Sequence, residues 1–329
     1  MHNFIIRLCS CFIFNPCARR SFRQRHWHNN TRAIPVNSDA VLNTLNALVN
    51  DVAYIKNFLH NTTDITKVSP AHGTMRQVQL LNLSVLQEVD RICRKHKLSY
   101  WLDFGTLLGA VRHGGFIPWD DDIDIGMPAP DYEKFLKLVD KELKGKCAVF
   151  KRIPSQIGKT LHRDFVPQTP EQWCDFIFWS LKGKLAFATD IFPYYFSDKD
   201  KPQIADTLRE CCELKAKLFE NFNGYDDFQN IEDNVTPLQK KIISKSGQYL
   251  FLGAEAMVYQ PHIYETDDVF PLKEVMFEGH KFFVPNNYNK ILIETYGNYF
   301  DFPRDMHKHL ALNELDAAEL KKLNNLGNL

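Results

Sequence analysis

The sequence lacks the cysteine spacing and the glycine and proline content that mark several classes of protein. Its eight cysteines form no Cys-x-x-Cys pair and no zinc-ligand spacing, and a chain of 329 residues can build a core without disulfides. With only 15 glycines and 16 prolines, a fibrous chain is excluded, and 44% hydrophobic residues exclude global disorder. We therefore expect a globular cytoplasmic protein with reduced thiols.

Lysine and acidic residues are absent from the first 37 positions. This segment holds six arginines, whereas the whole chain has no formal net charge, so the remainder is mildly acidic. Because residues 38–329 are mildly acidic, we expect no nucleic-acid partner. Residues 4–14 (FIIRLCSCFIF) are the longest apolar run there, and they reach only half of the ~20 residues that span a bilayer.

The amino-terminal segment is instead typical of a helix that lies in a membrane interface. On a helix, four apolar side chains share one face, and arginines follow directly: Phe4, Ile5, Leu8 and Phe12. Apolar burial and anionic headgroups together hold such a helix. We expect residues 1–37 to form a basic amphipathic arm that contacts an anionic membrane surface through residues 1–25. The alternatives are an arm packed on the protein itself and a type II signal anchor.

Residues 38–60 have apolar side chains at alternating spacings of four and three, which is heptad periodicity. The positions are Val41, Leu45, Leu48, Val52, Ile55 and Leu59. The pattern predicts a helix that either forms a coiled coil, giving a homo-oligomer, or packs on the main domain. Residues 61–74 are polar and predict a linker, so we place the main domain at 75–310 and a helical tail at 311–329.

Helical and strand-like segments intermix in the main domain, which predicts an α+β fold with a mixed sheet flanked by helices. Apolar periodicity predicts helices over 75–97, 131–143, 203–221, 236–252 and 287–296. Short apolar runs predict strands over 100–102, 123–125, 147–153, 174–180 and 185–196. Residues 275–284 predict a hairpin that turns at Glu278-Gly279.

The densest chemistry lies in residues 103–126, DFGTLLGAVRHGGFIPWDDDIDIG. Asp120, Asp122 and Asp124 would share one face of a strand, with isoleucines buried behind them. Like charges repel, so a cation should compensate them, and oxygen ligands favour Mg²⁺ or Mn²⁺. An EF-hand calcium-binding loop is excluded, because Ile125 occupies the position at which that loop requires glycine. A solvated acidic turn would not interleave isoleucines with its acids.

Other candidates flank the acids. Gly105 and Thr106 begin a predicted helix, where free N–H groups and a hydroxyl can hold a phosphate. Arg112, on the same helix, has the chemistry either to clamp a phosphate or to pair with the acids. His113 is a candidate acid or base near neutral pH, against the plainer interpretation of a helix-end histidine.

Residues 100–135, YWLDFGTLLGAVRHGGFIPWDDDIDIGMPAPDYEKF, resemble the LicD family of phosphotransferases and the related fukutin-related proteins. The resemblance extends over residues 75–305. It implies a nucleotidyltransferase-like fold, in which a Gly-Thr/Ser turn opens a helix, a D-h-D strand binds metal and a later strand supplies a third carboxylate. Asp190, in a strand-like run, is our candidate for that third carboxylate. It would bridge a second metal or accept a proton from the attacking hydroxyl.

The resemblance and the chemistry of the residues together give two sets of site residues. The metal set is Asp120, Asp122, Asp124 and Asp190, of which the last three are also the catalytic candidates. The phosphate and substrate set is Gly105, Thr106, Arg112 and His113. Trp101 and Trp119 are candidates for a cage around a choline ammonium, against a role in the core.

The resemblance also implies a reaction, the transfer of a phospho-alcohol group from a CDP-activated donor to a sugar hydroxyl. We expect the transferred group to be phosphocholine. We expect the acceptor to be a cell-surface glycan such as lipopolysaccharide, either free or lipid-linked. Transfer of ribitol phosphate or glycerol phosphate would use the same chemistry and is the alternative. The enzyme would be peripheral at the cytoplasmic face of the membrane, with a Golgi type II protein as the alternative.

Three other functions compete with this interpretation. Asp122-Ile123-Asp124 also suits a metal-dependent DxD glycosyltransferase that uses a nucleotide sugar. A nucleotidyltransferase that adds a nucleotide would release pyrophosphate rather than CMP. A membrane-associated scaffold would need none of the acids, and their presence together with Gly105 argues against it.

Overall fold

The computed structural model describes residues 38–143, 147–151, 176–180, 189–220, 227–254 and 261–303. The described residues belong to two compact units, 38–68 with 299–303 and 69–298. The predicted arm at 1–37, its membrane contact through 1–25 and the tail at 311–329 lie outside the described residues. In the part of the chain that the structure describes, no helix has the length and hydropathy needed to cross a bilayer.

The smaller unit consists mainly of one long helix. Helix α3 (Ser38–Thr62) has 25 residues and covers the segment predicted to be helical. A short 3₁₀ turn, η1 (Ile65–Lys67), follows within the predicted linker. Asp64 caps this turn, because its carboxylate accepts a hydrogen bond from the Thr66 N–H at 3.0 Å.

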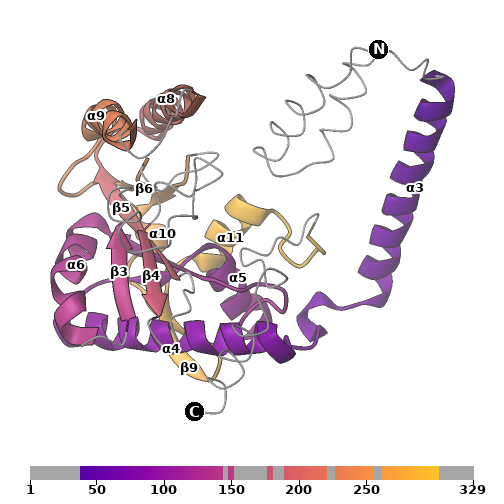
Figure 1. Cartoon of the computed structure of the whole chain (residues 1–329), viewed down its shortest axis with the longest axis horizontal. Helices are drawn as coiled ribbons and strands as arrows, with labels where there is room; N and C mark the ends of the chain where they lie inside the picture. Colours follow the sequence, from indigo (N-terminus) through magenta and orange to yellow (C-terminus); the bar gives the residue numbers. More distant parts are fainter. Residues whose placement is uncertain are drawn as a thin grey trace. The chain divides into compact units, whose positions relative to one another are not determined.

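The larger unit is built on a mixed sheet of seven strands, which confirms the predicted α+β class. Five strands follow one another in the order β1 (Trp101–Leu102), β2 (Ile123–Pro128), β5 (Thr189–Ser197), β4 (Phe176–Ser180) and β3 (Cys147–Lys151). Figure 1 labels β5, β4 and β3 of this series. β6 (Tyr249–Leu252) pairs with the second half of β5, and β7 (Ile263–Glu265) pairs with β6. Among the described strand pairs, only β2 and β5 are parallel.

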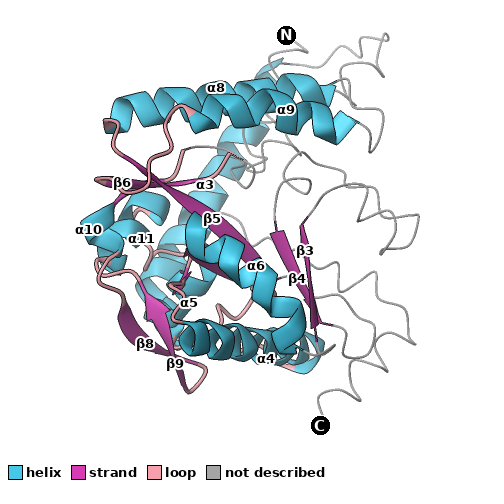
Figure 2. Cartoon of the chain, turned by 90° about the vertical axis from the view of Figure 1, so that its left-hand side faces the viewer, coloured by secondary structure: helices cyan, strands magenta, loops and turns pink. Residues whose placement is uncertain are grey.

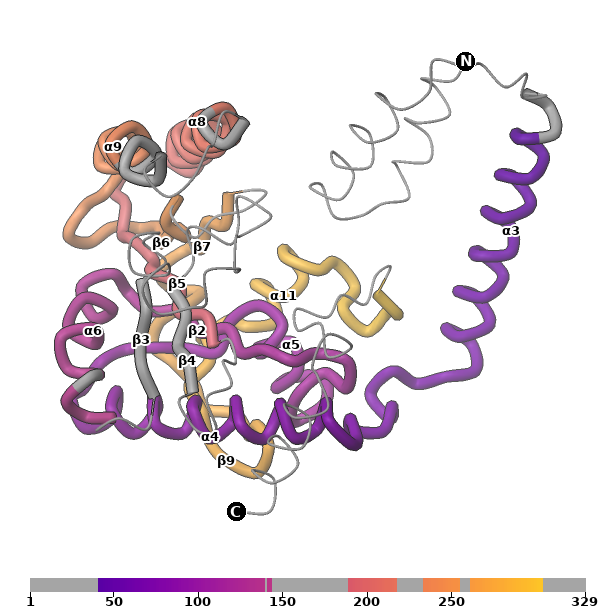
Figure 3. The backbone as a smooth tube through the Cα atoms, viewed as in Figure 1, coloured from indigo at the N-terminus to yellow at the C-terminus, as the bar shows by residue number. Residues whose placement is uncertain are grey.

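Helices flank this sheet. α4 (Gly73–His96) and α6 (Ala129–Leu143) pack against the sheet and against each other, whereas α8 (Lys201–Glu220) and α9 (Asp227–Lys240) form a separate pair (Figure 2). A one-turn helix, α10 (Thr266–Val269), follows β7. α11 (Tyr288–Tyr296), from late in the sequence, lies beside α5 (Phe104–His113) (Figure 3).

The core around β1 is aromatic and tightly packed. Trp101 is fully buried, with its ring centroid 5.1 Å from that of Tyr194 and 6.1 Å from that of Phe270. Gly126 pairs with Trp101 across β1 and β2, and a Cβ there would lie 2.3 Å from the indole. Trp101 is therefore a core residue, which confirms the core role that we weighed against a place in a choline cage.

A two-stranded hairpin, β8 (Lys273–Phe277) and β9 (His280–Val284), completes the unit. Glu278 and Gly279 form its turn with φ angles of 50° and 79°. Positive φ at both central residues gives the twist that a two-residue hairpin needs. The predicted hairpin and its turn are confirmed.

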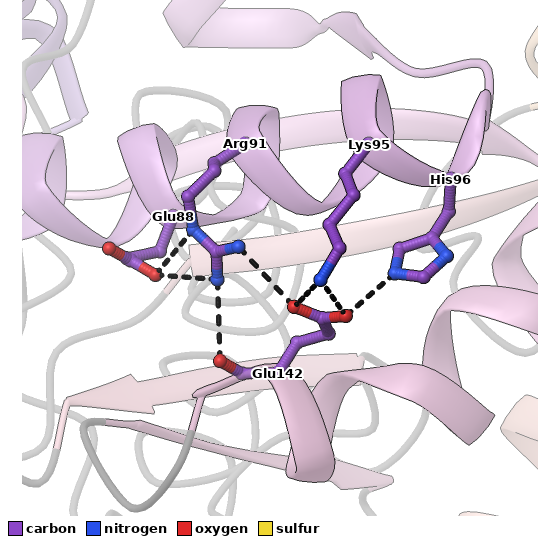
Figure 4. A network of polar contacts seen from close by, with 5 residues as sticks. All are labelled: Glu88, Arg91, Lys95, His96 and Glu142. Carbon is purple, nitrogen blue, oxygen red and sulfur yellow. Dashed lines mark hydrogen bonds and ion pairs between the residues drawn. The ribbon is translucent and has the colours of Figure 1, made fainter.

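An ionic network fixes α4 to α6 (Figure 4). The carboxylate of Glu142 on α6 accepts from Lys95 at 2.7 Å and from Arg91 at 3.3 Å, and it lies 2.8 Å from His96 Nε2. Arg91 also pairs with Glu88 at 3.0 Å. Hydrogen bonds from Lys95 and His96 lower the pKa of Glu142 to about 2. α4 therefore stays anchored above that pH.

Candidate metal and phosphate site

The one parallel pair among the described strands brings Asp124 and Asp190 side by side. In the register of β2 and β5, Asp124 lies opposite Asp190 and Ile123 lies opposite Thr189. Because side chains alternate along a strand, aligned residues of neighbouring strands point to the same face. Two acids that are distant in the sequence thus meet at one point of the sheet.

Asp122 joins these two acids in a group of three carboxylates. One oxygen from each of the three lies within 4.8 Å of the others. Asp122 is buried, and Asp124 and Asp190 are half-buried. Three negative charges so close together repel each other strongly unless a cation lies among them. An all-oxygen donor set is the kind that hard divalent cations prefer, so the group could hold a metal ion.

Asp120 has a different place from the one that strand alternation predicts. β2 begins only at Ile123, so Asp120 and Asp122 both precede the strand, and the prediction that they share a strand face with Asp124 is wrong. Its carboxylate lies beside Gly105, where a Cβ would be 2.7 Å from Asp120 Oδ2 and 3.5 Å from Asp124 Oδ2. Asp120 therefore flanks the three carboxylates, and the bare backbone of Gly105 gives both acids room to approach α5.

The start of α5 is hydrogen-bonded to Asp124. The Gly105 N–H donates to Asp124 Oδ2 at 3.1 Å, and the Asp124 N–H donates to Thr106 Oγ1 at 2.8 Å. The Asp124 carbonyl accepts from the Asp103 N–H at 3.0 Å. Gly105 and Thr106, which were predicted to hold a phosphate, thus position Asp124. The Thr106 hydroxyl is still able to donate its own hydrogen to another oxygen.

Arg112 and His113 lie next to each other at the end of α5. Arg112 Nε donates to His113 Nε2 at 3.0 Å. Burial, and then the charge of Arg112, lowers the pKa of His113 to about 4, so this histidine is neutral at physiological pH. Burial lowers the pKa of Arg112 to about 10 against the opposing effects of Tyr296 and Asp120, so its guanidinium stays charged. Trp119 lies near both, 5.9 Å from the guanidinium.

Comparison with known proteins identifies the domain that carries these residues. Residues 97–241 match the family model described as LicD/FKTN/FKRP, nucleotidyltransferase domain. The matched range contains β1, α5, β2 and β5, and hence all three clustered carboxylates. Residues 97–241 of this chain therefore form a domain of the LicD/FKTN/FKRP type. The resemblance noted in residues 100–135 is confirmed.

Individual relatives support the assignment. Lipopolysaccharide cholinephosphotransferase LicD of Haemophilus influenzae is 29% identical over 256 residues, which cover 70% of this chain and 92% of that protein. An uncharacterized protein of Rickettsia typhi is 28% identical over 178 residues, 54% of this chain and 48% of that protein. Human and mouse ribitol 5-phosphate transferase FKRP are 59% identical over 34 residues, which cover 10% of this chain and 7% of FKRP. LicD and FKRP are both phosphate-group transferases by name.

Asp103 is a buried acid of the LicD-family domain that we did not predict. It is 1% exposed, and its carboxylate accepts hydrogen bonds from the Phe104 N–H at 3.0 Å and the Tyr194 O–H at 2.6 Å. Burial raises the pKa of Asp103 to about 6, although both hydrogen bonds oppose the shift. Because Tyr194 belongs to β5, Asp103 links the start of α5 to the strand of Asp190. Its position just before the predicted helix, where aspartate is a preferred N-cap residue, was the signal that could have identified Asp103.

Tyr296, at the end of α11, is a second unpredicted residue near the acids. Burial of its hydroxyl end, and then the charges of Asp124 and Asp120, hold the pKa of Tyr296 well above its ordinary value. The hydroxyl therefore keeps its proton at physiological pH. The protonated hydroxyl is thus a hydrogen-bond donor that interacts electrostatically with Asp124 and Asp120.

Two buried amides of α4 hold the backbone of the acidic segment. Gln79 Nε2 donates to the carbonyl of Asp120 at 2.8 Å and to that of Ile117 at 3.2 Å. Asn82 Nδ2 donates to the carbonyl of Asp121 at 2.7 Å. Both amide side chains are fully buried. Since α4 is itself anchored to α6, these hydrogen bonds fix the backbone of residues 117–121 to the rest of the domain.

The hairpin turn holds the residues that lead into the acids. The Glu278 carboxylate accepts from Arg76 at 2.9 and 2.6 Å and from the Phe116 N–H at 3.1 Å. The Glu278 N–H donates to the Gly114 carbonyl at 2.9 Å. A non-glycine residue with φ of 50° costs ~1–2 kcal/mol. These contacts offset that cost, so the turn clamps Gly114–Phe116.

Replacing Glu278 with glutamine should therefore destabilise the LicD-family domain. Glu278→Gln keeps the size of the side chain but removes the charge that faces Arg76, and we expect the free energy of unfolding to fall by about 1–3 kcal/mol. Urea unfolding measures this loss. Glu274→Gln on the same hairpin is the matched control, because its more exposed pair with Arg94 should contribute under about 1 kcal/mol. Equal losses in the two variants would contradict the clamp.

Proposed function

We propose that this protein transfers a phosphocholine group from CDP-choline to a sugar hydroxyl of a cell-surface glycan, using Mg²⁺ or Mn²⁺. The observation that carries the proposal is the meeting of Asp122, Asp124 and Asp190, with one oxygen of each within 4.8 Å of the others, inside the family domain. The choice of phosphocholine and of the acceptor rests on the 29% identity to a lipopolysaccharide cholinephosphotransferase along 92% of its length.

The chemistry of a CDP-activated donor explains the need for clustered acids. The sugar oxygen attacks the phosphorus of the phosphocholine group, the bond to the CMP oxygen breaks, and CMP leaves. Negative charge grows on the phosphate oxygens during this step, and a bound divalent cation offsets it. Asp122 and Asp124 would hold the cation. Asp190 either completes its ligands from the next strand or takes the proton from the attacking hydroxyl.

Neighbouring donors suit the phosphate oxygens. Thr106 bonds Asp124, and Arg112 and Tyr296 interact electrostatically with Asp120, so these three groups are our candidates for donating hydrogen bonds to the phosphate oxygens. Gly105 contributes by holding Asp124 through its N–H. His113 is neutral and accepts from Arg112, so it orients that guanidinium rather than serving as an acid at neutral pH.

The decisive experiment is release of CMP by the purified full chain. The protein receives CDP-choline, CDP-ribitol or CDP-glycerol with Mg²⁺, because slow hydrolysis reports the donor even without the acceptor. We expect CMP from CDP-choline, lost with EDTA and in Asp190→Asn. Asp206→Asn, a matched change of an exposed acid on α8, should retain the activity.

Ribitol phosphate transfer is the second candidate, because 34 residues are 59% identical to ribitol 5-phosphate transferase FKRP. A preference for CDP-ribitol over CDP-choline in the same assay would favour it. No CMP from any donor, together with calorimetric binding of a UDP-sugar, would favour a glycosyltransferase. Binding of neither class would favour a scaffold without catalysis.

A further inference from the structure

α3 exposes large apolar side chains along its length. Leu48, Val52 and Ile55 have 54%, 65% and 55% of their surface exposed. Four more apolar residues of the helix are similarly open to solvent: Leu42, Val49, Tyr54 and Phe58. A continuous apolar surface of this kind marks a contact site in a soluble protein.

The apolar stripe of α3 follows a strict seven-residue repeat. Its core positions, a and d of a heptad, are Val41, Leu45, Leu48, Val52, Ile55 and Leu59. The outermost position, f, is asparagine in each of three successive heptads: Asn43, Asn50 and Asn57. A helix packed on a globular body follows the 3.6-residue period, whereas a repeat of seven on both faces is typical of a coiled coil.

The charges beside the stripe indicate the partner and its direction. Asp51 precedes core position Val52 and so occupies position g, and Lys56 follows core position Ile55 and so occupies position e. In a parallel coiled coil in register, a g residue lies beside the e residue five positions later on the other helix. Asp51 would then meet Lys56 of a second copy, twice in each dimer. In an antiparallel pair g faces g and e faces e, so these opposite charges would not meet.

We propose that α3 pairs with α3 of a second copy of this chain in a parallel, in-register coiled coil, which makes the enzyme a dimer. The pairing goes beyond the proposed function, because α3 lies outside the family domain at 97–241. It would tether two transferase domains through their amino-terminal sides without contributing to either set of carboxylates.

Sedimentation of the full chain tests the dimer. We expect a mass near twice 38.3 kDa at micromolar concentration, and a mass near 38.3 kDa for Leu48→Glu/Ile55→Glu. Tyr54→Glu is the matched control, because Tyr54 is 71% exposed but lies off the stripe, and this variant should remain a dimer. All three proteins should bind Mn²⁺ alike. A monomeric natural chain, or a dimer that survives the double substitution, would overturn the proposal.

Charge exchange tests the direction. Asp51→Lys and Lys56→Asp each replace two attractions by two repulsions, so each should raise the dimer dissociation constant by about tenfold. Mixing the two variants should give heterodimers in preference to either homodimer, and Asp51→Lys/Lys56→Asp in one chain should restore dimerisation. Homodimers that are unaffected by the single changes, or a double variant weaker than both, would overturn the parallel register.

Discussion

Asp124→Asn should lower the rate of phospho-group transfer by about 10³-fold or more, which corresponds to about 4 kcal/mol of transition-state stabilisation. Asparagine has the size of aspartate and keeps an oxygen that can accept from the Gly105 N–H, so the junction of α5 and β2 should persist. It removes one of the three charges that hold the cation beside the phosphate. The loss should appear in the rate constant at saturating donor, because the charge on the phosphate grows in the transition state.

Metal binding gives this prediction a readout that does not depend on activity. In the natural chain the three repelling carboxylates should be stabilised by Mn²⁺, so the midpoint of thermal unfolding should rise with Mn²⁺ concentration. Asp124→Asn should lose most of that rise, and Asp206→Asn should keep it. If Asp124→Asn binds Mn²⁺ as tightly as the natural chain and keeps its rate, the three carboxylates are not the metal site.

The parts of the site that are local in sequence could be predicted from sequence. The spacing of the acids predicted that Asp122 and Asp124 lie together, although Asp122 precedes β2, and the Glu278-Gly279 dipeptide predicted the hairpin turn. The role of Asp190 was predicted only from the family resemblance, because no nearby residue indicates that β5 pairs in parallel with β2. The register of the two strands, which sets Asp190 against Asp124, depends on pairing between distant segments.

Element boundaries failed where pairing decides them. We predicted a helix over 236–252, but α9 ends at Lys240 and Tyr249–Leu252 form strand β6. A short apolar run cannot be told from a helix segment by periodicity alone, and here its pairing with β5 selects the strand. Asp120 was misplaced for a related reason, since β2 starts only where its pairing with Thr189 begins.

Burial decides the chemical state of side chains, and burial is a tertiary property. His113 looks like a neutral-pH acid or base until the structure surrounds it and places Arg112 against its ring nitrogen. The sequence left Trp101 open to a choline cage or the core, and packing against Gly126 and Tyr194 places it in the core. Residues of the same types in open loops would keep the properties that the sequence indicates.

Asp103 should make the protein less stable as pH rises from about 4 to about 6. An aspartate in the unfolded chain has a pKa near ~3.9. Burial raises the pKa of Asp103 to about 6 in the folded chain. Between these values the folded state holds a proton that the unfolded state has lost, so the free energy of unfolding falls with rising pH and then levels off above about pH 6. Two pKa units correspond to about 3 kcal/mol, an upper figure for this group.

Urea unfolding of the natural chain and of Asp103→Asn at intervals between pH 4 and pH 7 isolates this contribution from other acids. Asparagine remains a good helix cap and is neutral throughout, so the natural chain should lose about 3 kcal/mol relative to the variant across the range. Tyr194→Phe removes a hydrogen bond that lowers the pKa of Asp103, so it should extend the loss to higher pH. A constant difference between the natural chain and Asp103→Asn would mean that Asp103 titrates as it does in water. In that case ionised Asp103 would join α5 to β5 at no cost in folding stability, and the carboxylate site between these elements would not be destabilised.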